Sequence, residues 1–295
     1  MGTGAYDLPV TSRRLLLVHA HPDDETLTTG GTIAHFAAQP DTSVTVVTCS
    51  LGEEGEVIPP ELALLEPGES DQLGGYRIGE LAAALDALGP VEHRYLGGVG
   101  RWRDSGMAHD GAVRATTPAV LHPRAFARPE AFDAEVAALV EILREVRPQT
   151  VITYDADGGY GHPDHLRVHA ITVAAVAQVP ARLFFTVIGR ETLAAGLARL
   201  AGLDGSPFRM PEPDELPSVP DKLVTTRLDV SARRERRLAA MRAHATQIAL
   251  WEDGEPGIGT VALAMSNLVA QPMLDVEEFI AADGEPGGLF PEEEP

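Results

Sequence analysis

The residues best suited to chemistry lie in two short clusters that are far apart in the chain. In the first cluster, residues 19–25 (HAHPDDE), two imidazoles and three carboxylates are crowded together. Charges this close are costly unless a cation or strong hydrogen bonds compensate them. The second cluster, residues 160–165 (YGHPDH), adds two histidines and an aspartate. An Asp-Asp pair alone is more often part of a solvated loop, but two clusters of this composition favour a shared metal site.

The types of the donor residues indicate which metal such a site would hold. Histidine and aspartate without cysteine point to zinc, with ferrous iron as its nearest substitute. Three protein ligands leave a position open for water, whose pKa the metal can lower to roughly 7. One of Asp23 and Asp24 can then bind the metal while the other acts as general base. The sequence has no HExxH helix, no lysine-containing phosphate loop and no GxSxG elbow, which are the motifs of rival mechanisms.

Both clusters come directly after short apolar runs. Residues 14–20 and 150–154 are continuous hydrophobic segments, which is typical of parallel strands buried on both faces. In doubly wound sheets, sites lie at the carboxyl ends of the strands. We therefore expect the two clusters to meet at one edge of a single sheet.

The remaining segments alternate in the way that such a sheet requires. Further strands are expected at residues 43–48, 91–96, 183–188 and 224–230. Helices are expected to start at residue 32 and to cover residues 77–88, 132–146, 166–179 and 231–250, the last of which carries His244 and could close over the site. Two long loops, 52–72 and 97–128, are of the kind that tends to carry function.

This order of elements predicts a Rossmann-like α/β fold with a mostly parallel, doubly wound sheet. The metal-binding catalytic domain is expected to span residues 12–190. A smaller C-terminal α/β lobe, residues 191–290, is expected to help form the substrate cleft.

Composition limits the kinds of partner. The net charge of −21 argues against a nucleic-acid groove or an anionic membrane as the partner, so a small-molecule substrate is expected. The lone Cys49 excludes an intramolecular disulfide and fits a reducing compartment. Residues Met1–Pro9 lack the features of a signal peptide, and no apolar run is long enough to span a membrane. We expect a cytoplasmic protein with an acidic, solvated tail at Glu292–Glu294; the sequence does not indicate its oligomeric state.

The two clusters, in this order, resemble the motifs of the zinc-dependent N-deacetylases of the LmbE-like, PIG-L-like superfamily. Several further stretches are similar to the mycothiol-pathway N-acetylglucosaminyl-inositol deacetylases of actinobacteria. These stretches are residues 48–58 (TCSLGEEGEVI), 71–81 (DQLGGYRIGEL), 96–107 (LGGVGRWRDSGM), 153–165 (TYDADGGYGHPDH) and 241–247 (MRAHATQ). The resemblance spans residues 12–275, and the long loops carry it as strongly as the strands do.

The resemblance implies a role for each polar residue of the clusters. The implied zinc ligands are His21, Asp24 and His165, and the implied general base is Asp23. The residues implied to polarise the substrate carbonyl and to stabilise the tetrahedral oxyanion are Tyr160 and His162. Asp164 is implied to orient a histidine or to tune its pKa.

The resemblance also implies a substrate. Arg77 and Asp104 match positions expected to hold sugar and inositol hydroxyls. The implied reaction is hydrolysis of N-acetylglucosaminyl-inositol to acetate and glucosaminyl-inositol in mycothiol biosynthesis. Another N-acetyl-sugar deacetylase of the superfamily, or a mycothiol S-conjugate amidase, is the alternative. The amidase pattern has a lysine soon after the acidic motif, where this chain has Thr26–Thr29 and no lysine. A non-catalytic sugar- or metal-binding module is the second alternative, and it would not need Asp23 beside the ligands.

Overall fold

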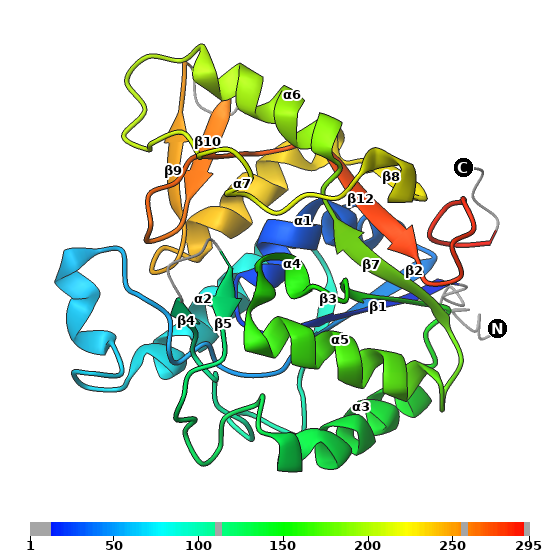
Figure 1. The fold of residues 1–295 in the computed structure, drawn as a ribbon. Helices are drawn as coiled ribbons and strands as arrows, with labels where there is room; N and C mark the ends of the chain where they lie inside the picture. The colour runs from blue at the N-terminus through cyan, green and yellow to red at the C-terminus, as the bar shows by residue number, and fades with distance from the viewer. Residues whose placement is uncertain (1–12, 110–113, 255–258, 292–295) are drawn as a thin grey trace, which may run out of the picture.

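A seven-stranded sheet forms the centre of the protein. The computed structural model describes residues 13–109, 114–254 and 259–291, so the expectations for Met1–Pro9 and Glu292–Glu294 lie outside the described residues. The strand order is β3-β2-β1-β6-β7-β12-β8. Its strands are β1 (Arg13–His19), β2 (Thr42–Thr48), β3 (Val91–Tyr95), β6 (Thr150–Tyr154), β7 (Arg182–Val187), β8 (Thr226–Asp229) and β12 (Val276–Ala281). Strands β3, β2, β1, β6 and β7 are parallel to one another. Strand β12 is antiparallel to both β7 and β8 (Figure 1).

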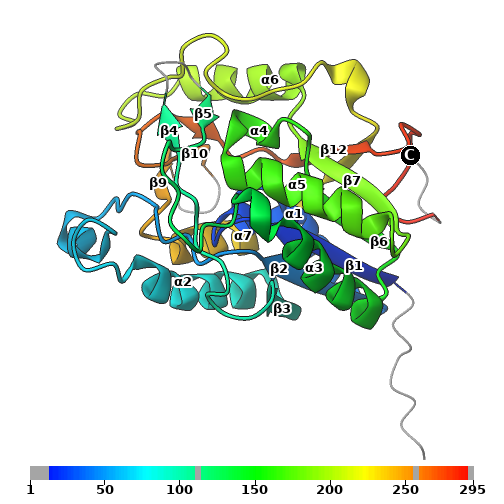
Figure 2. The ribbon, with the colours of Figure 1, turned by 60° about the horizontal axis from the view of Figure 1, so that its bottom comes forward.

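Helices cover both faces of this sheet (Figure 2). One face packs against α3 (Phe132–Val146) and α5 (Pro163–Val176), and the other against α1 (Asp24–Ala37), α2 (Leu73–Leu88) and α7 (Arg234–Ala243). Successive strand residues point to opposite faces, so Leu15 and Leu17 enter the α1/α2 core while Leu16 and Val18 enter the α3/α5 core. This double burial explains the continuous apolar run of β1 and confirms the expected α/β architecture.

The remaining elements are short or peripheral. The C-terminal part carries α6 (Arg190–Ala201) and a small antiparallel sheet of β9 (Ala249–Glu252), β10 (Val261–Ala264) and β11 (Gln271–Pro272). The long loops contain η1 (Pro60–Leu65) and a hairpin of β4 (Ala108–His109) and β5 (Ala115–Thr116). Single turns are η2 (Pro129–Ala131), α4 (Gly158–Gly161), η3 (Asp221–Leu223) and η4 (Ser231–Arg233). Because β8 and β12 join the main sheet, the C-terminal part is built into the core, and the boundary at residue 190 stays a prediction.

The first helix differs from its prediction. It begins at Asp24, whereas the sequence suggested a start at Thr32, after the glycine pair. The backbone amides of Gly31 and Thr32 donate to the buried carboxylate of Glu277, at 2.7 and 2.8 Å. A Cβ on Gly31 would lie 2.5 Å from Val230, so this position must be glycine. The glycine pair therefore marks close packing of α1 against the C-terminal part, and not a loop.

The last helix is also shorter than predicted. The expected helix over residues 231–250 ends at Ala243, and the segment beyond it turns into β9. The His244 side chain bonds to Glu25 at 2.8 Å, and the amide of Thr246 donates to Glu80 at 2.8 Å. These long-range bonds replace the hydrogen bonds that would extend the helix.

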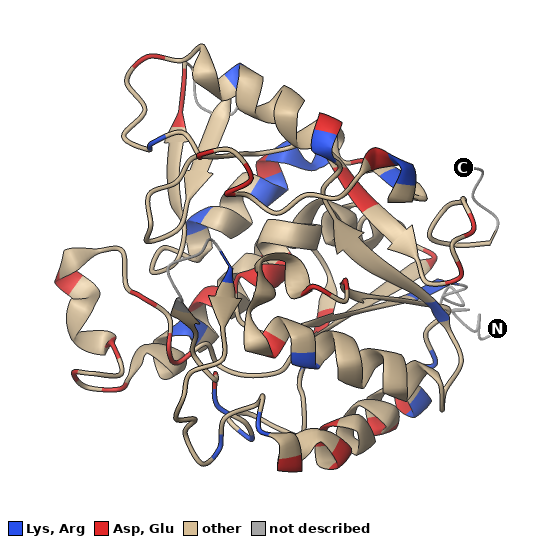
Figure 3. Cartoon of the chain, in the orientation of Figure 1, with Lys and Arg blue, Asp and Glu red and all other residues tan. Residues whose placement is uncertain are grey.

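Charge and hydrophobicity are distributed as in a globular domain. Asp and Glu residues are spread over helices and loops, while several arginines lie on α7 (Figure 3). Within the described part of the chain, none of the helices has both the length and the apolar character needed to cross a bilayer.

A buried carboxyl on α3 gives the stability of the protein a pH dependence. Neither carboxyl oxygen of Glu135 has a hydrogen-bond partner in the described ranges, and the guanidinium of Arg167 lies 3.6 Å away. Burial raises the pKa of Glu135 from its ordinary value of 4.5 to about 8, although Arg167 opposes this. The folded state thus holds a proton that the unfolded state has already released near neutral pH. Stability associated with this group is present below its unfolded pKa and is lost as the pH rises through 8.

We therefore expect Glu135→Gln to flatten the pH dependence of unfolding. Between pH 6 and pH 8.5, the wild type should lose about 2 kcal/mol more unfolding free energy than the variant does. Urea unfolding at the two pH values measures this difference. Glu141→Gln, on the exposed side of the same helix, is the control and should follow the wild type. Parallel pH profiles for wild type and Glu135→Gln would contradict the assignment.

Candidate metal centre

The two clusters meet where the sequence placed them, at the carboxyl ends of neighbouring strands. β1 pairs with β6, and each strand is followed by a turn that leads into a helix. Asp23 is the N-cap of α1 and His162 is the N-cap of α5. The first turns of these helices then carry Asp24 and His165 towards each other.

Asp24 lies between two histidines. Its Oδ2 is 3.2 Å from Nδ1 of His21, and its Oδ1 is 3.3 Å from Nε2 of His165. All three side chains are buried, and Nε2 of His165 has no hydrogen-bond partner among the residues that the structure describes. Asp24 also sits in the first turn of α1, where the helix dipole favours a negative charge. Nitrogen and oxygen lone pairs therefore face one another in a way that suits a common cation.

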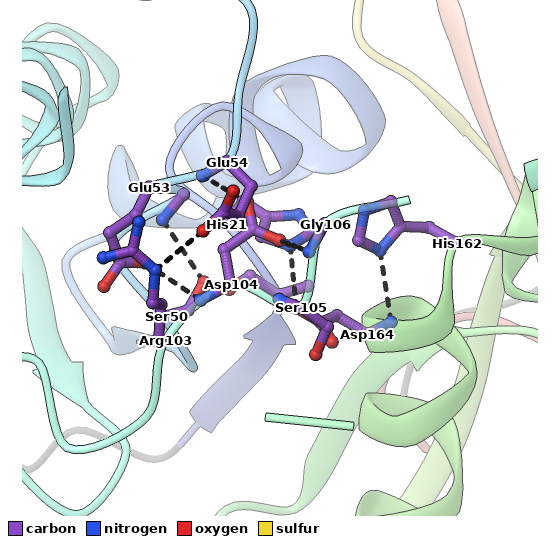
Figure 4. A network of polar contacts seen from close by, with 12 residues as sticks. His21, Ser50, Glu53, Glu54, Arg103, Asp104, Ser105, Gly106, His162 and Asp164 are labelled. Carbon is purple, nitrogen blue, oxygen red and sulfur yellow. Dashed lines mark hydrogen bonds and ion pairs between the residues drawn. The ribbon is translucent and has the colours of Figure 1, made fainter. Parts of the chain in front are cut away.

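More carboxylates surround His21 than one histidine needs (Figure 4). Nε2 of His21 lies 3.2 Å from Oδ2 of Asp164 and 3.4 Å from Oδ1 of Asp104. Among the described residues, two groups have ligand atoms that all lie within 4.8 Å of one another. They are His21, His162 and His165, and His21, Asp104 and Asp164. A buried set of imidazoles and carboxylates without thiolate fits zinc or a similar divalent cation.

The pKa shifts within the cluster also favour a bound cation. Burial lowers the pKa of His21, but the neighbouring carboxylates, Asp104 foremost, outweigh burial and raise it well above its usual range. Burial raises the pKa of Asp24, but His165 and His21 outweigh burial and hold it well below its usual range. The cluster thus attracts positive charge, which is the property that a cation site requires.

Asp23 occupies a different position from its neighbour. Its φ of 122° is rare for a residue other than glycine, and such backbone strain persists only where the surroundings enforce it. Burial raises the pKa of its carboxyl to about 6, while Arg77, with Nη2 3.1 Å from Oδ2, opposes the rise. A carboxylate with a pKa near neutrality is suited to general base catalysis.

The two residues predicted to bind substrate hydroxyls are both buried. Nη1 of Arg77 donates to the Gly52 carbonyl at 2.8 Å, and Nη2 donates to the Pro22 carbonyl as well as contacting Asp23. Asp104 lies beside His21 and accepts the amide of Gly106 at 2.8 Å. The structure therefore places Arg77 at the candidate base and Asp104 at the candidate metal ligands.

His162 and Tyr160 can act as hydrogen-bond donors. Nδ1 of His162 accepts the backbone amide of Asp164 at 3.1 Å, so the proton of the neutral ring lies on Nε2. Burial, together with His21 and His165, lowers the pKa of His162 well below its usual range and keeps the ring neutral. The Tyr160 ring lies 6.0 Å from the His162 ring, and burial raises the pKa of its phenol.

The role that the resemblance implies for Asp164, orienting a histidine or tuning its pKa, stays a prediction, and the histidine beside its carboxylate is His21. Its carboxylate approaches His21 and accepts the amide of Ser105 at 3.0 Å. Its hydrogen bond with His162 is made by its backbone amide.

Tyr154 is a site residue that sequence reasoning missed. Its ring stacks on that of His165, with centroids 4.1 Å apart and planes 3° apart. Its hydroxyl accepts the amide of Ala20 at 2.9 Å and so links the ends of β6 and β1. Its place as the last residue of a predicted strand, just before the second cluster, was the available signal.

Comparison with known proteins adds a family and a set of relatives. The sequence profile of the family described as GlcNAc-PI de-N-acetylase (PIG-L) matches residues 16–176, which include both clusters. A Saccharopolyspora erythraea protein named 1D-myo-inositol 2-acetamido-2-deoxy-alpha-D-glucopyranoside deacetylase 1 is 54% identical over 278 residues, covering 93% of this chain and 91% of that protein. A protein of Actinosynnema mirum with the same name, apart from the final number, is 54% identical over 92% of each chain.

Solved structures show the same fold at lower identity. A deacetylase–teicoplanin complex from the teicoplanin biosynthesis pathway aligns with a TM-score of 0.52 and 21% identity. The alignment covers 92% of this chain and 99% of that one. This likeness supports the α/β fold of the chain over the aligned part.

Proposed function

The chain belongs to the GlcNAc-PI de-N-acetylase (PIG-L) family, and we propose that it removes the acetyl group of 1D-myo-inositol 2-acetamido-2-deoxy-alpha-D-glucopyranoside. The products are acetate and glucosaminyl-inositol, and the step belongs to mycothiol biosynthesis. The observation that carries the reaction type is the strained, buried Asp23 beside a His/Asp cation site. The assignment of the substrate rests on the names of the relatives that are 54% identical over most of the chain. The cytoplasmic location stays a prediction from the sequence.

We propose that Zn²⁺ is held by His21, Asp24 and His165, with Fe²⁺ as a substitute. The contacts of Asp24 with both histidines support this set. When bound, zinc polarises a carbonyl and lowers the pKa of water to about 7. The His21–Asp164 contact fixes the orientation of one ligand from outside.

The residues of the chain then move the protons. Asp23 takes a proton from the attacking water on its carboxylate, and its pKa of about 6 leaves it ionised at neutral pH. Nε2–H of His162 and the Tyr160 hydroxyl donate to the developing oxyanion, an effect typically of several kcal/mol. Neutral His162 has a low pKa and keeps its Nε2 proton in the hydrogen bond to the oxyanion. We therefore assign proton delivery to the departing amine to Asp23, which has taken up the proton of the water.

Two buried residues are proposed to bind the sugar. Asp104 and Arg77 are the proposed contacts of its hydroxyls, as the resemblance implies. Arg77 has a second task, because its guanidinium also holds the carboxylate of Asp23.

A paired assay tests the substrate. Purified zinc-loaded enzyme is given N-acetylglucosaminyl-inositol in one series and a bulky mycothiol S-conjugate in the other, and amide hydrolysis is followed in both. We expect a higher kcat/KM for acetate release from the sugar. A higher value for the conjugate would identify the enzyme as an amidase.

A further inference from the structure

A buried ion pair of Glu25 and His244 is hydrogen-bonded to the backbone of Asp23 and takes no part in the proton transfers proposed for the reaction. We propose that Glu25 and His244 form a positioning pair that holds the peptide of Asp23 in its strained conformation, an inference that rests on the proposed function. The two residues are 219 positions apart, and both side chains are fully buried. Neither residue touches the substrate; the pair acts through the general base.

Glu25 makes all the contacts that this role requires. Its Oε2 accepts the backbone amide of Asp23 at 2.9 Å, and its Oε1 accepts Nε2 of His244 at 2.8 Å and Oγ1 of Thr26 at 2.5 Å. One carboxylate thus binds the strained peptide with one oxygen and is anchored through the other. Asp23 is held at both ends, because Arg77 binds its carboxylate while Glu25 binds its amide.

The strain explains why such a hold is needed. A non-glycine residue in a sparsely populated backbone region costs about 1–3 kcal/mol, and without restraint it relaxes to an ordinary conformation. Relaxation at Asp23 would turn the carboxylate away from the position set by Arg77. Displacing a reacting group by about 1 Å can cost about 100-fold in rate.

The side chain of His244 is hydrogen-bonded to Glu25. Among the described residues its buried Nδ1 has no hydrogen-bond partner, so the side-chain hydrogen bond of His244 there is the one from Nε2 to Glu25. His244 follows the last residue of α7, and α7 packs against α1 and α2 (Figure 1). The C-terminal part thereby contributes a residue that holds the candidate base in place.

The competing explanation is that the pair only fastens the end of α7 to the core. The same turn has a second buried anchor of that kind, in which Glu80 accepts the amide of Thr246 at 2.8 Å and its hydroxyl at 2.7 Å. Glu80 is buried to a similar degree and has no contact with Asp23 among the hydrogen bonds of the described residues. It is therefore a matched control for Glu25.

Two substitutions of Glu25 separate the effect of its side-chain length from the effect of its charge. Glu25→Gln loses the charge but keeps the length, so its carbonyl can accept the Asp23 amide while its NH₂ group donates to neutral His244. Glu25→Asp keeps the charge but is one methylene shorter and cannot reach both partners. We expect kcat of Glu25→Gln to stay within about threefold of wild type and that of Glu25→Asp to fall about 30- to 100-fold. KM and zinc content should change little in either variant.

Three measurements on each variant test the positioning role of Glu25. Acetate release gives kcat and KM, elemental analysis gives bound zinc, and hydrogen exchange of the Asp23 amide reports the hydrogen bond without any substrate. The amide should be protected in wild type and Glu25→Gln and exchange faster in Glu25→Asp. Glu80→Asp should leave kcat and the exchange of the Asp23 amide unchanged.

The outcomes that overturn the inference are distinct from failure of the proposed function. Equal losses in the two Glu25 variants, a better Glu25→Asp, loss of zinc in step with kcat, or the same kcat loss in Glu80→Asp would each reject a positioning role. Wild-type enzyme that releases no acetate would reject the proposed function. In that case the order of Asp23 amide protection still decides whether Glu25 holds the peptide.

Discussion

Asp23→Asn is expected to lower kcat for acetate release by about 1,000-fold, within the range found for general bases, while bound zinc stays at the wild-type level. The amide cannot take a proton from water, and so the step assigned to Asp23 is lost. Asparagine tolerates positive φ better than alanine does, and its oxygen can still accept a hydrogen bond from Arg77. The loss should therefore report chemistry and not disruption of the loop.

The measurement is a steady-state assay on protein whose metal content has been determined. Asp86→Asn, an exposed aspartate on α2, is a suitable control and should keep wild-type kcat. Asp23→Asn with near wild-type turnover would remove Asp23 from the mechanism. Loss of zinc together with turnover would instead place Asp23 among the metal ligands.

His165→Ala is expected to lose the metal. Within the described part of the chain, the Nε2 atom of His165 has no hydrogen-bond partner and faces Asp24 at 3.3 Å, so removing the ring takes away one of the proposed ligands. Outer-shell changes typically cost 10- to 100-fold in metal affinity, so a lost ligand should cost more than about 100-fold. Elemental analysis after dialysis should find little zinc in the variant, and its activity should fall in parallel.

His169→Ala is the matched control for this prediction. His169 lies one turn further along α5 and contacts the Tyr154 carbonyl through Nδ1 at 2.9 Å, away from Asp24. It should retain wild-type zinc content. Stoichiometric zinc in His165→Ala would refute the ligand assignment.

Much of the architecture could be predicted because its signals are local. The helix Phe132–Val146 and the strand Thr150–Tyr154 have the predicted bounds, since one carries a strong amphipathic pattern and the other is a short apolar run. The two clusters could be brought together because parallel strands place their carboxyl ends at one edge. This rule located the site without any knowledge of the family.

The features that could not be predicted depend on residues distant in the sequence. The start of α1 was misplaced because Glu277, from β12, binds the amides of Gly31 and Thr32, so the glycine pair lies inside the helix. The end of α7 was misplaced because the segment after it binds Glu25 and Glu80. Arg77 was expected at the substrate, and no local pattern indicates that its guanidinium contacts Asp23. Side-chain pairings of this kind follow from the packed structure and have no period or spacing of their own.

We infer that the His21, Asp24 and His165 site makes this chain a metal-dependent deacetylase. The most direct test is acetate release from N-acetylglucosaminyl-inositol by purified enzyme that has been stripped with a chelator and then titrated with Zn²⁺. The account predicts negligible release from stripped enzyme and recovery that saturates at one zinc per chain in wild type, with no recovery in His165→Ala. Full acetate release by stripped enzyme, or none at any zinc level, would contradict it.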